Sequence, residues 1–329
     1  MYENASGNRD EPGSASGQRT RFPRISHRAY EHPVALAALT TMRKIKGFDT
    51  ALKGLSAAIS EPVFRMQHLS SAIRVGPRQL SHLHEIVEEA ASILDLDDPP
   101  EVYVRDIGGV NAFTTGMKRP FVVIGSGLMG VMDEGELRFV IGHELGHVLS
   151  GHTVYHAMGQ MLADTASLST IPGVAVASEG IKVGIREWFR KSELSCDRAG
   201  LLVAQDPDAA IGALMKLAAG ARIPGMSPDE FLQQAAEFEL DTTGIKNRIF
   251  KFMVPSETHP ILVLRATELD RWIRTGGYDR IVTDGVYENR DDAQPTIRED
   301  AKAGFDRFIE NRKQKAADRL SRRSGGAPD

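Results

Sequence analysis

Two histidines that lie four residues apart, His143 and His147, most limit what this chain can fold into. They follow Asp133 and Glu136, an N-cap and its capping-box partner, which together predict a helix through about Gly151. On an α-helix, side chains at this spacing lie about 40° apart and one turn along the axis, so both imidazoles can reach one ion. The rest of the chain must therefore enclose this face of the helix and complete the site.

The residues around the two histidines favour a site over an ordinary helix. Glu144 lies about 100° around the helix from His143 and about 60° from His147, so its carboxylate flanks the ion without being forced to bind it. It is then free to take a proton from water at the metal. Gly142 and Gly146 each cost about 1 kcal/mol of helix propensity relative to alanine, which indicates close packing or access to the site. The alternative is a helix whose histidines are solvated or satisfied in the core.

A third ligand must come from elsewhere, because a zinc ion that performs chemistry takes three protein ligands and keeps one position open. His152 lies about 140° from His147 on the same predicted helix, so the geometry counts against it. Glu193 fits better, because it lies on a second predicted helix, over about residues 185–204, with Asp197 one turn later. Asp197 can then accept the free ring N–H of a ligand histidine. The alternative is a pair of exposed acids beside basic neighbours.

The remaining pattern predicts an α+β fold that is mainly helical, with a small twisted sheet. Helical periodicity runs over residues 33–96, and two short β-branched and aromatic runs, over residues 100–105 and 119–124, predict strands. Residues 153–184 favour two helices with a break, and residues 256–272 a further amphipathic helix. We expect a disordered leader over residues 1–26, a helical N-terminal layer over 27–98, a catalytic domain over 99–285 and a charged, mobile tail over 286–329.

Composition excludes several classes of partner. Forty basic residues against 44 acidic ones give a net charge of −4, so no global field favours nucleic acid or an anionic membrane. The single cysteine, Cys196, cannot form an internal disulfide. Residues 1–18 lack the apolar segment of a secretory signal, and no apolar run reaches the roughly 18 residues that a spanning helix needs. We therefore expect no transmembrane segment and a cytoplasmic location.

Several motifs in the same order resemble one known family. The resemblance covers about residues 99–272 and is carried by Asn111-Ala112-Phe113, Gly127-Leu128, Glu136-Leu137, His143-Glu144-Leu145-Gly146-His147, Glu193 with Asp197, Thr258-His259-Pro260 and Arg265. These residues are similar to those of the HtpX-like and CAAX prenyl endopeptidase family of zinc metallopeptidases. The resemblance implies the gluzincin arrangement, in which one helix supplies two histidines and another a glutamate. It implies one zinc ion per chain on His143, His147 and Glu193, with Glu144 as general base.

The resemblance also implies how further residues serve the site. An edge strand over residues 119–124, with Val122 and Val123, would pair with an extended peptide substrate, and Asn111 would lie near that groove. His259 is expected to support the metal or stabilise an oxyanion, or only to cap the helix before the following proline. Arg265 is expected to pair with Asp197, or to form an ordinary surface salt bridge.

These residues together predict a zinc-dependent endopeptidase that acts on peptides or unfolded proteins in quality control or processing. One alternative is a catalytically weak or latent module that only binds exposed segments, and another is a structural zinc domain. Many relatives of this family span membranes. Residues 171–177 lie between the two predicted ligand helices, where such relatives carry spanning segments, so a weak contact of this segment with a membrane surface is a further hypothesis. Cys196 replaces the small apolar residue that is usual at this position in the family. It is either a buried core residue or a thiol whose oxidation would inhibit the site. Oligomeric state stays open.

Overall fold

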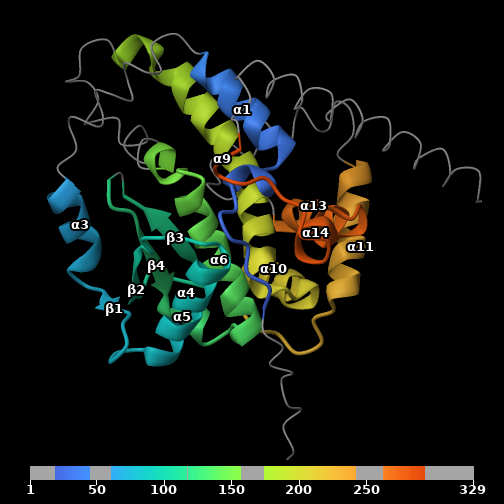
Figure 1. Cartoon of the computed structure of the whole chain (residues 1–329), viewed down its shortest axis with the longest axis horizontal. Coiled ribbons are helices and arrows are strands. Elements are labelled where there is room, and N and C mark those ends of the chain that lie inside the picture. Colours follow the sequence, from blue (N-terminus) through green and yellow to red (C-terminus); the bar gives the residue numbers. More distant parts are fainter. Residues whose placement is uncertain (1–18, 45–60, 117, 157–173, 242–261, 293–329) are drawn as a thin grey trace, which may run out of the picture.

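The computed structural model describes residues 19–44, 61–116, 118–156, 174–241 and 262–292, in which helices surround a small mixed sheet (Figure 1). The predicted, mainly helical α+β class is confirmed. Along the chain, its elements are η1 (His27–Ala29), α1 (Pro33–Arg43), α3 (Glu61–Leu69), β1 (Ile73–Arg74), α4 (Ser81–Ile93), β2 (Glu101–Arg105), β3 (Ala112–Thr115), β4 (Phe121–Gly125), α5 (Ser126–Met129), α6 (Glu134–Leu149), α9 (Val174–Ala204), α10 (Pro207–Ala219), α11 (Pro228–Asp241), α13 (Leu262–Arg274) and α14 (Gly277–Val282).

The sheet has the strand order β1-β2-β4-β3. Strands β2 and β4, which the sequence predicts, run parallel, whereas β3 pairs antiparallel with β4 and was not predicted. The expectation that residues 119–124 form the edge strand is wrong, because β4 is paired on both sides. Val122 faces Val102 on one side and Thr114 on the other, and Val123 is similarly enclosed. These two residues therefore have no free backbone edge for a peptide, and in the described part of the chain β3 is the edge strand beside them.

Residues 19–26 are packed into the fold, which corrects this part of the expected disordered leader over residues 1–26. Phe22 and Ile25 are fully buried, because the segment lies in the core beside α4. Ile25 also bridges to Asn289, and the Ser26 amide donates to the Glu288 carbonyl. The first residues of the expected mobile tail are thus docked against this segment. Residues 1–18 and 293–329 lie outside the described residues.

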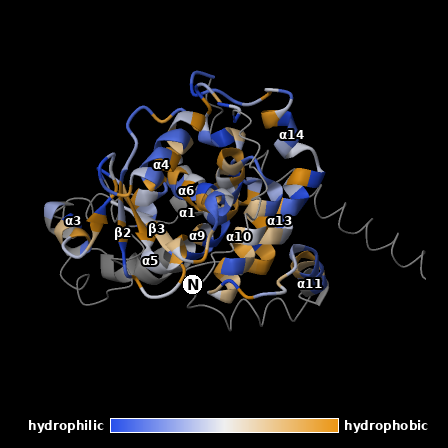
Figure 2. Cartoon of the chain, turned by 90° about the horizontal axis from the view of Figure 1, so that it is seen from below, coloured by the Kyte–Doolittle hydropathy of each residue, from blue (hydrophilic) through white to orange (hydrophobic). Residues whose placement is uncertain are grey.

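The helices pack into one core around α6. Figure 2 shows hydrophobic residues concentrated where the helices meet, with hydrophilic residues toward the outer loops. Helix α4 contributes Leu83, Ile86 and Val87 to the same buried cluster as Leu145 of α6. The segment expected as a helical N-terminal layer therefore shares its core with the predicted catalytic domain, and it also contributes β1 to the sheet. On the other side, α1 lies along α9 (Figure 1).

Helix α6 begins as predicted, with the Asp133 side chain accepting from the Glu136 amide and Glu136 closing the capping box. The two glycines of this helix allow α9 to approach closely. A Cβ at Gly142 would lie 2.6 Å from the Cβ of Val203, and one at Gly146 would lie 2.7 Å from the Cβ of Ala199. Both glycines are therefore required by helix packing.

Helix α9 begins at residue 174, eleven residues before the predicted start. The sequence also predicts a break between two helices over residues 153–184, and residues 157–173 of that segment lie outside the described part.

We predict that Gly142→Ala destabilises the protein although alanine is the better helix former. The added methyl group overlaps Val203 and the Cα of Gly200, and such overpacking typically costs about 1–3 kcal/mol. Urea unfolding followed by circular dichroism measures the change. Gly130→Ala is the control, because its Cβ would meet only the Gly127 carbonyl oxygen at 3.8 Å. Equal stability of the two variants would contradict the packing argument.

Candidate metal centre

Three side chains from two helices meet at one buried point. His143 and His147 come from α6 and Glu193 from α9, and all three are less than 7% exposed. The two histidine Nε2 atoms lie 3.2 Å apart, and Glu193 places one carboxylate oxygen 3.4 Å from His143 Nε2 and the other 3.3 Å from His147 Nε2. A tetrahedral ion with bonds of about 2.0–2.1 Å separates its ligand atoms by about 3.3–3.4 Å. The donor types and their spacing therefore fit a zinc-sized cation.

A buried network of ion pairs and hydrogen bonds contacts two of these three residues, His143 and Glu193. The Nδ1 atom of His143 lies 3.0 Å from a carboxylate oxygen of Asp197. Arg265, on α13, donates to Asp197 from Nε at 2.8 Å and to Glu193 from a terminal nitrogen at 3.1 Å. Because Arg265 is only 4% exposed, the alternative of an ordinary surface salt bridge does not apply. Three helices are thus tied together at the metal centre.

The charges of this network favour an ionised ligand set. Burial alone would raise the pKa of Asp197, but the Arg265 guanidinium and the hydrogen bonds from Arg265 and His143 hold it below its ordinary value. Burial alone would lower the pKa of His143, but hydrogen bonds to Asp197 and Glu193 raise it to about 9. In the metal-free protein, His143 therefore carries a proton at neutral pH. A cation that binds its Nε2 atom must displace that proton.

Glu144 follows His143 on α6 but is not among the three residues whose donor atoms cluster. Its side chain is buried, and the Thr114 hydroxyl lies 2.5 Å from one of its carboxylate oxygens and 3.2 Å from its backbone carbonyl oxygen. Thr114 belongs to β3, so the edge of the sheet is fastened directly to the predicted general base. Sequence reasoning missed Thr114. Nothing in the local sequence indicates it, because only the packing of β3 against α6 brings the two residues together.

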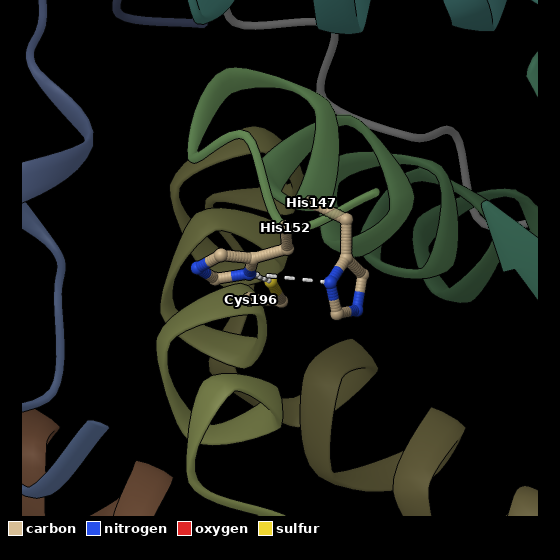
Figure 3. Close-up of side chains that lie close together, drawn as sticks. All are labelled: His147, His152 and Cys196. Atoms are coloured by element: carbon tan, nitrogen blue, oxygen red, sulfur yellow. Dashed lines mark hydrogen bonds between the residues drawn. The ribbon is translucent and has the colours of Figure 1, made fainter. Parts of the chain in front are cut away.

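The second ring nitrogen of His147 faces a different cluster (Figure 3). Its Nδ1 lies 3.3 Å from Nδ1 of His152, which in turn lies 3.5 Å from the Cys196 sulfur. The sequence prediction placed His152 on another face because it assumed that the helix continued to this residue. In the structure, α6 ends at Leu149 and Gly151 has a φ of +64°, so the chain turns back toward His147. Burial raises the pKa of the Cys196 thiol well above its usual value. Burial also lowers the pKa of the His152 imidazole well below its usual value.

Two further residues, Asn111 and His259, are predicted to serve the site. Asn111 precedes the edge strand, and its side-chain oxygen accepts a hydrogen bond from the Ala112 amide. His259 lies outside the described residues, as do Thr258 and Pro260. The roles expected of Asn111 and His259 stay predictions.

A helix that supplies two histidines and an adjacent free glutamate, with a third ligand from a second helix, defines a class of metallopeptidase. Residues 77–273 match peptidase family M48, and the chain belongs to that family. It is therefore a metalloprotease, and the resemblance to HtpX-like metallopeptidases is confirmed. No solved structure matches the chain significantly.

Its relatives include both plant and bacterial proteins. The plastoglobule-localized metallopeptidase 48, chloroplastic, of Arabidopsis thaliana is 32% identical over 77% of this chain and 74% of its own length. A protease HtpX homolog of Pseudarthrobacter chlorophenolicus is 27% identical over 61% of this chain and 75% of its own. Within the described residues, we find no helix that is both long enough and apolar enough to cross a membrane. The cytoplasmic location stays a prediction.

We predict that Arg265→Met strongly destabilises the metal-free protein, because it leaves Asp197 and Glu193 buried without their cation. Breaking a buried ion pair from one side typically costs about 3–5 kcal/mol. Chemical denaturation measures the loss. Arg274→Met, on the same helix but with an exposed side chain, should change stability by less than about 0.5 kcal/mol. A small effect at Arg265 would show that the network contributes little.

We also predict that metal affinity rises with pH and levels off above about pH 9. The raised pKa of His143 means that its imidazole is protonated below about 9, and one competing proton weakens binding about tenfold per pH unit. Competition with a chelator of known pH dependence, between about pH 6.5 and 8.5, measures the slope. An affinity that does not change over this range would contradict the assignment of this proton.

Proposed function

We propose that this chain is a zinc-dependent endopeptidase in which His143, His147 and Glu193 hold one zinc ion and Glu144 is the general base. The observation that supports this best is Glu144, which is buried on the same turn of α6 as His143 and His147 but is not among the three residues whose donor atoms cluster. A structural site would use its ligands to close the coordination sphere, whereas a catalytic site keeps one position open.

The donor set supports zinc because two imidazoles and a carboxylate are ligands that zinc binds at catalytic sites. When bound, the ion supplies Lewis acidity, which polarises a carbonyl and lowers the pKa of water toward about 7. Asp197 keeps the His143 ring oriented, and Arg265 holds both Asp197 and Glu193 in place. The chain itself thus fixes the ligands before any ion arrives.

Glu144 supplies the proton transfers. Its carboxylate accepts a proton from the attacking water and then delivers that proton to the leaving amine nitrogen. The hydroxyl of Thr114 orients this carboxylate through the oxygen to which it is bonded, which leaves the other oxygen for the water. No covalent intermediate with the protein is needed. His259 remains our proposal for oxyanion stabilisation.

We propose that the substrate is an extended peptide or unfolded segment that pairs with β3. Among the described residues, β3 pairs with no strand other than β4, so a further strand would add at its outer edge. A peptide added there would lie next to Thr114 and hence next to Glu144. Main-chain pairing of this kind gives affinity with little sequence preference, which suits quality control or processing. Asn111, at the beginning of β3, would contact the same peptide.

We predict that Glu144→Gln lowers casein cleavage by at least about a hundredfold while zinc binding persists, because proton transfer typically contributes 10²–10⁴-fold. Initial rates and bound zinc are measured on the same preparations. The control is Glu134→Gln, whose exposed carboxylate pairs with Arg138 at the start of α6.

The same experiment tests the competing interpretations. If the wild type does not cleave casein but still binds it, and Glu144→Gln binds equally well, the chain is a binding module or a latent enzyme. If removal of zinc unfolds the chain, as followed by circular dichroism, the metal is structural. Unchanged cleavage by Glu144→Gln would exclude Glu144 as the base.

A further inference from the structure

The cluster of His147, His152 and Cys196 has the composition and spacing of a second metal site (Figure 3). One donor atom from each residue lies within 4.8 Å of the other two, and Nδ1 of His152 faces both Nδ1 of His147 and Sγ of Cys196. All three residues are at most 2% exposed. In Figure 3, the two rings and the sulfur converge on one point between the end of α6 and the middle of α9.

Two of the distances between donor atoms match those between the ligand atoms of a tetrahedral metal site. Bonds of about 2.0–2.1 Å to nitrogen and about 2.3 Å to sulfur give nitrogen–nitrogen edges of about 3.3–3.4 Å and nitrogen–sulfur edges of about 3.5–3.6 Å. The observed values are 3.3 Å between the two histidine nitrogens and 3.5 Å between His152 and Cys196. These donors need only small adjustments to bind one ion.

The surroundings hold the cluster in place before an ion binds. The His152 ring packs edge-on against the fully buried Trp188, with ring centroids 5.0 Å apart. Trp188 and Cys196 lie on the same helix, α9, so the sulfur and the ring that supports His152 move together. The His147 ring is fixed by its contact with Glu193 on the opposite side. Such a prearranged set of donors is what a metal site requires.

We propose that His147, His152 and Cys196 form a second cation site, separate from the catalytic one, that selects a thiophilic d¹⁰ cation such as Zn²⁺ or Cu⁺. Thiolate and imidazole donors favour these ions over Mg²⁺ or Ca²⁺. The two sites share the His147 ring, which turns Nε2 toward Glu193 and Nδ1 toward His152. When both are filled, the Cys196 thiol and the His147 ring each release a proton to solvent, and the ring bridges the two ions.

This second site would restrain the first. A cation on Nδ1 takes away the ring proton of His147 and places positive charge on the far side of the ring. Because His147 also binds the catalytic ion through Nε2, excess thiophilic metal is expected to weaken that ion's binding and slow peptide cleavage. The existence of the site does not depend on peptide cleavage, so it is tested by binding alone.

The test is titration of the full-length, metal-free chain with Co²⁺ under anaerobic conditions, followed by absorption. A cobalt–thiolate bond gives a near-ultraviolet charge-transfer band that imidazole and carboxylate ligands do not give, so only the second site produces it. We expect wild type to bind about two cobalt ions per chain with this band, and Cys196→Ser to bind about one without it. Ser192→Ala, a buried neighbour on α9, is the control and should keep the band.

A variant without the catalytic ligands isolates the second site. His143→Ala combined with Glu193→Gln should keep the charge-transfer band with about one cobalt ion per chain, and adding Cys196→Ser should abolish it. Absence of the band from both the wild type and this variant would overturn the proposal and leave the cluster as a hydrogen-bond array around His147. If circular dichroism shows that the variant does not fold, the comparison of wild type with Cys196→Ser decides. One cobalt ion bound by Cys196→Ser would show that the catalytic site itself is intact.

Discussion

The close packing of α6 against α9 is the constraint on which the rest of the structure depends. Helix α6 carries both histidines, but the third ligand is on α9, so the helices must lie near enough for Glu193 to reach between them. Gly142 and Gly146 make this possible, because any side chain there would collide with Val203 or Ala199. The helix propensity that these glycines give up is offset by the packing and the site that they permit.

The charge network extends this packing to a third helix. Arg265 of α13 is buried between Asp197 and Glu193, so the position of α13 is linked electrostatically to that of the proposed metal ligands. A buried arginine is tolerated here because two carboxylates compensate its charge. The same pairing keeps Asp197 ionised and available to His143. Stability and orientation of the ligands therefore come from one group of interactions.

The functional residues of α6 contact two different parts of the structure. On the sheet side, Thr114 of β3 is hydrogen-bonded to Glu144, which brings the outer strand β3 next to the proposed general base. On the side of its C-terminus, the turn at Gly151 returns His152 to the second nitrogen of His147, where Cys196 of α9 joins it. One helix thus connects the proposed substrate strand, the metal centre and the proposed second cation site.

The sequence by itself determined the helix of residues 134–149, its capping box and two of the strands, because each follows from a pattern within a short segment. It also predicted His143, His147 and Glu193 as ligands, and the structure brings their donor atoms together. Only the tertiary structure decided that β3 is the edge strand, that residues 19–26 are buried, and that Thr114 and His152 adjoin the site. These features arise from contacts between residues far apart in the chain, or from a turn that ends a helix. Periodicity reports which face of an element is buried, but it does not report which neighbour covers that face.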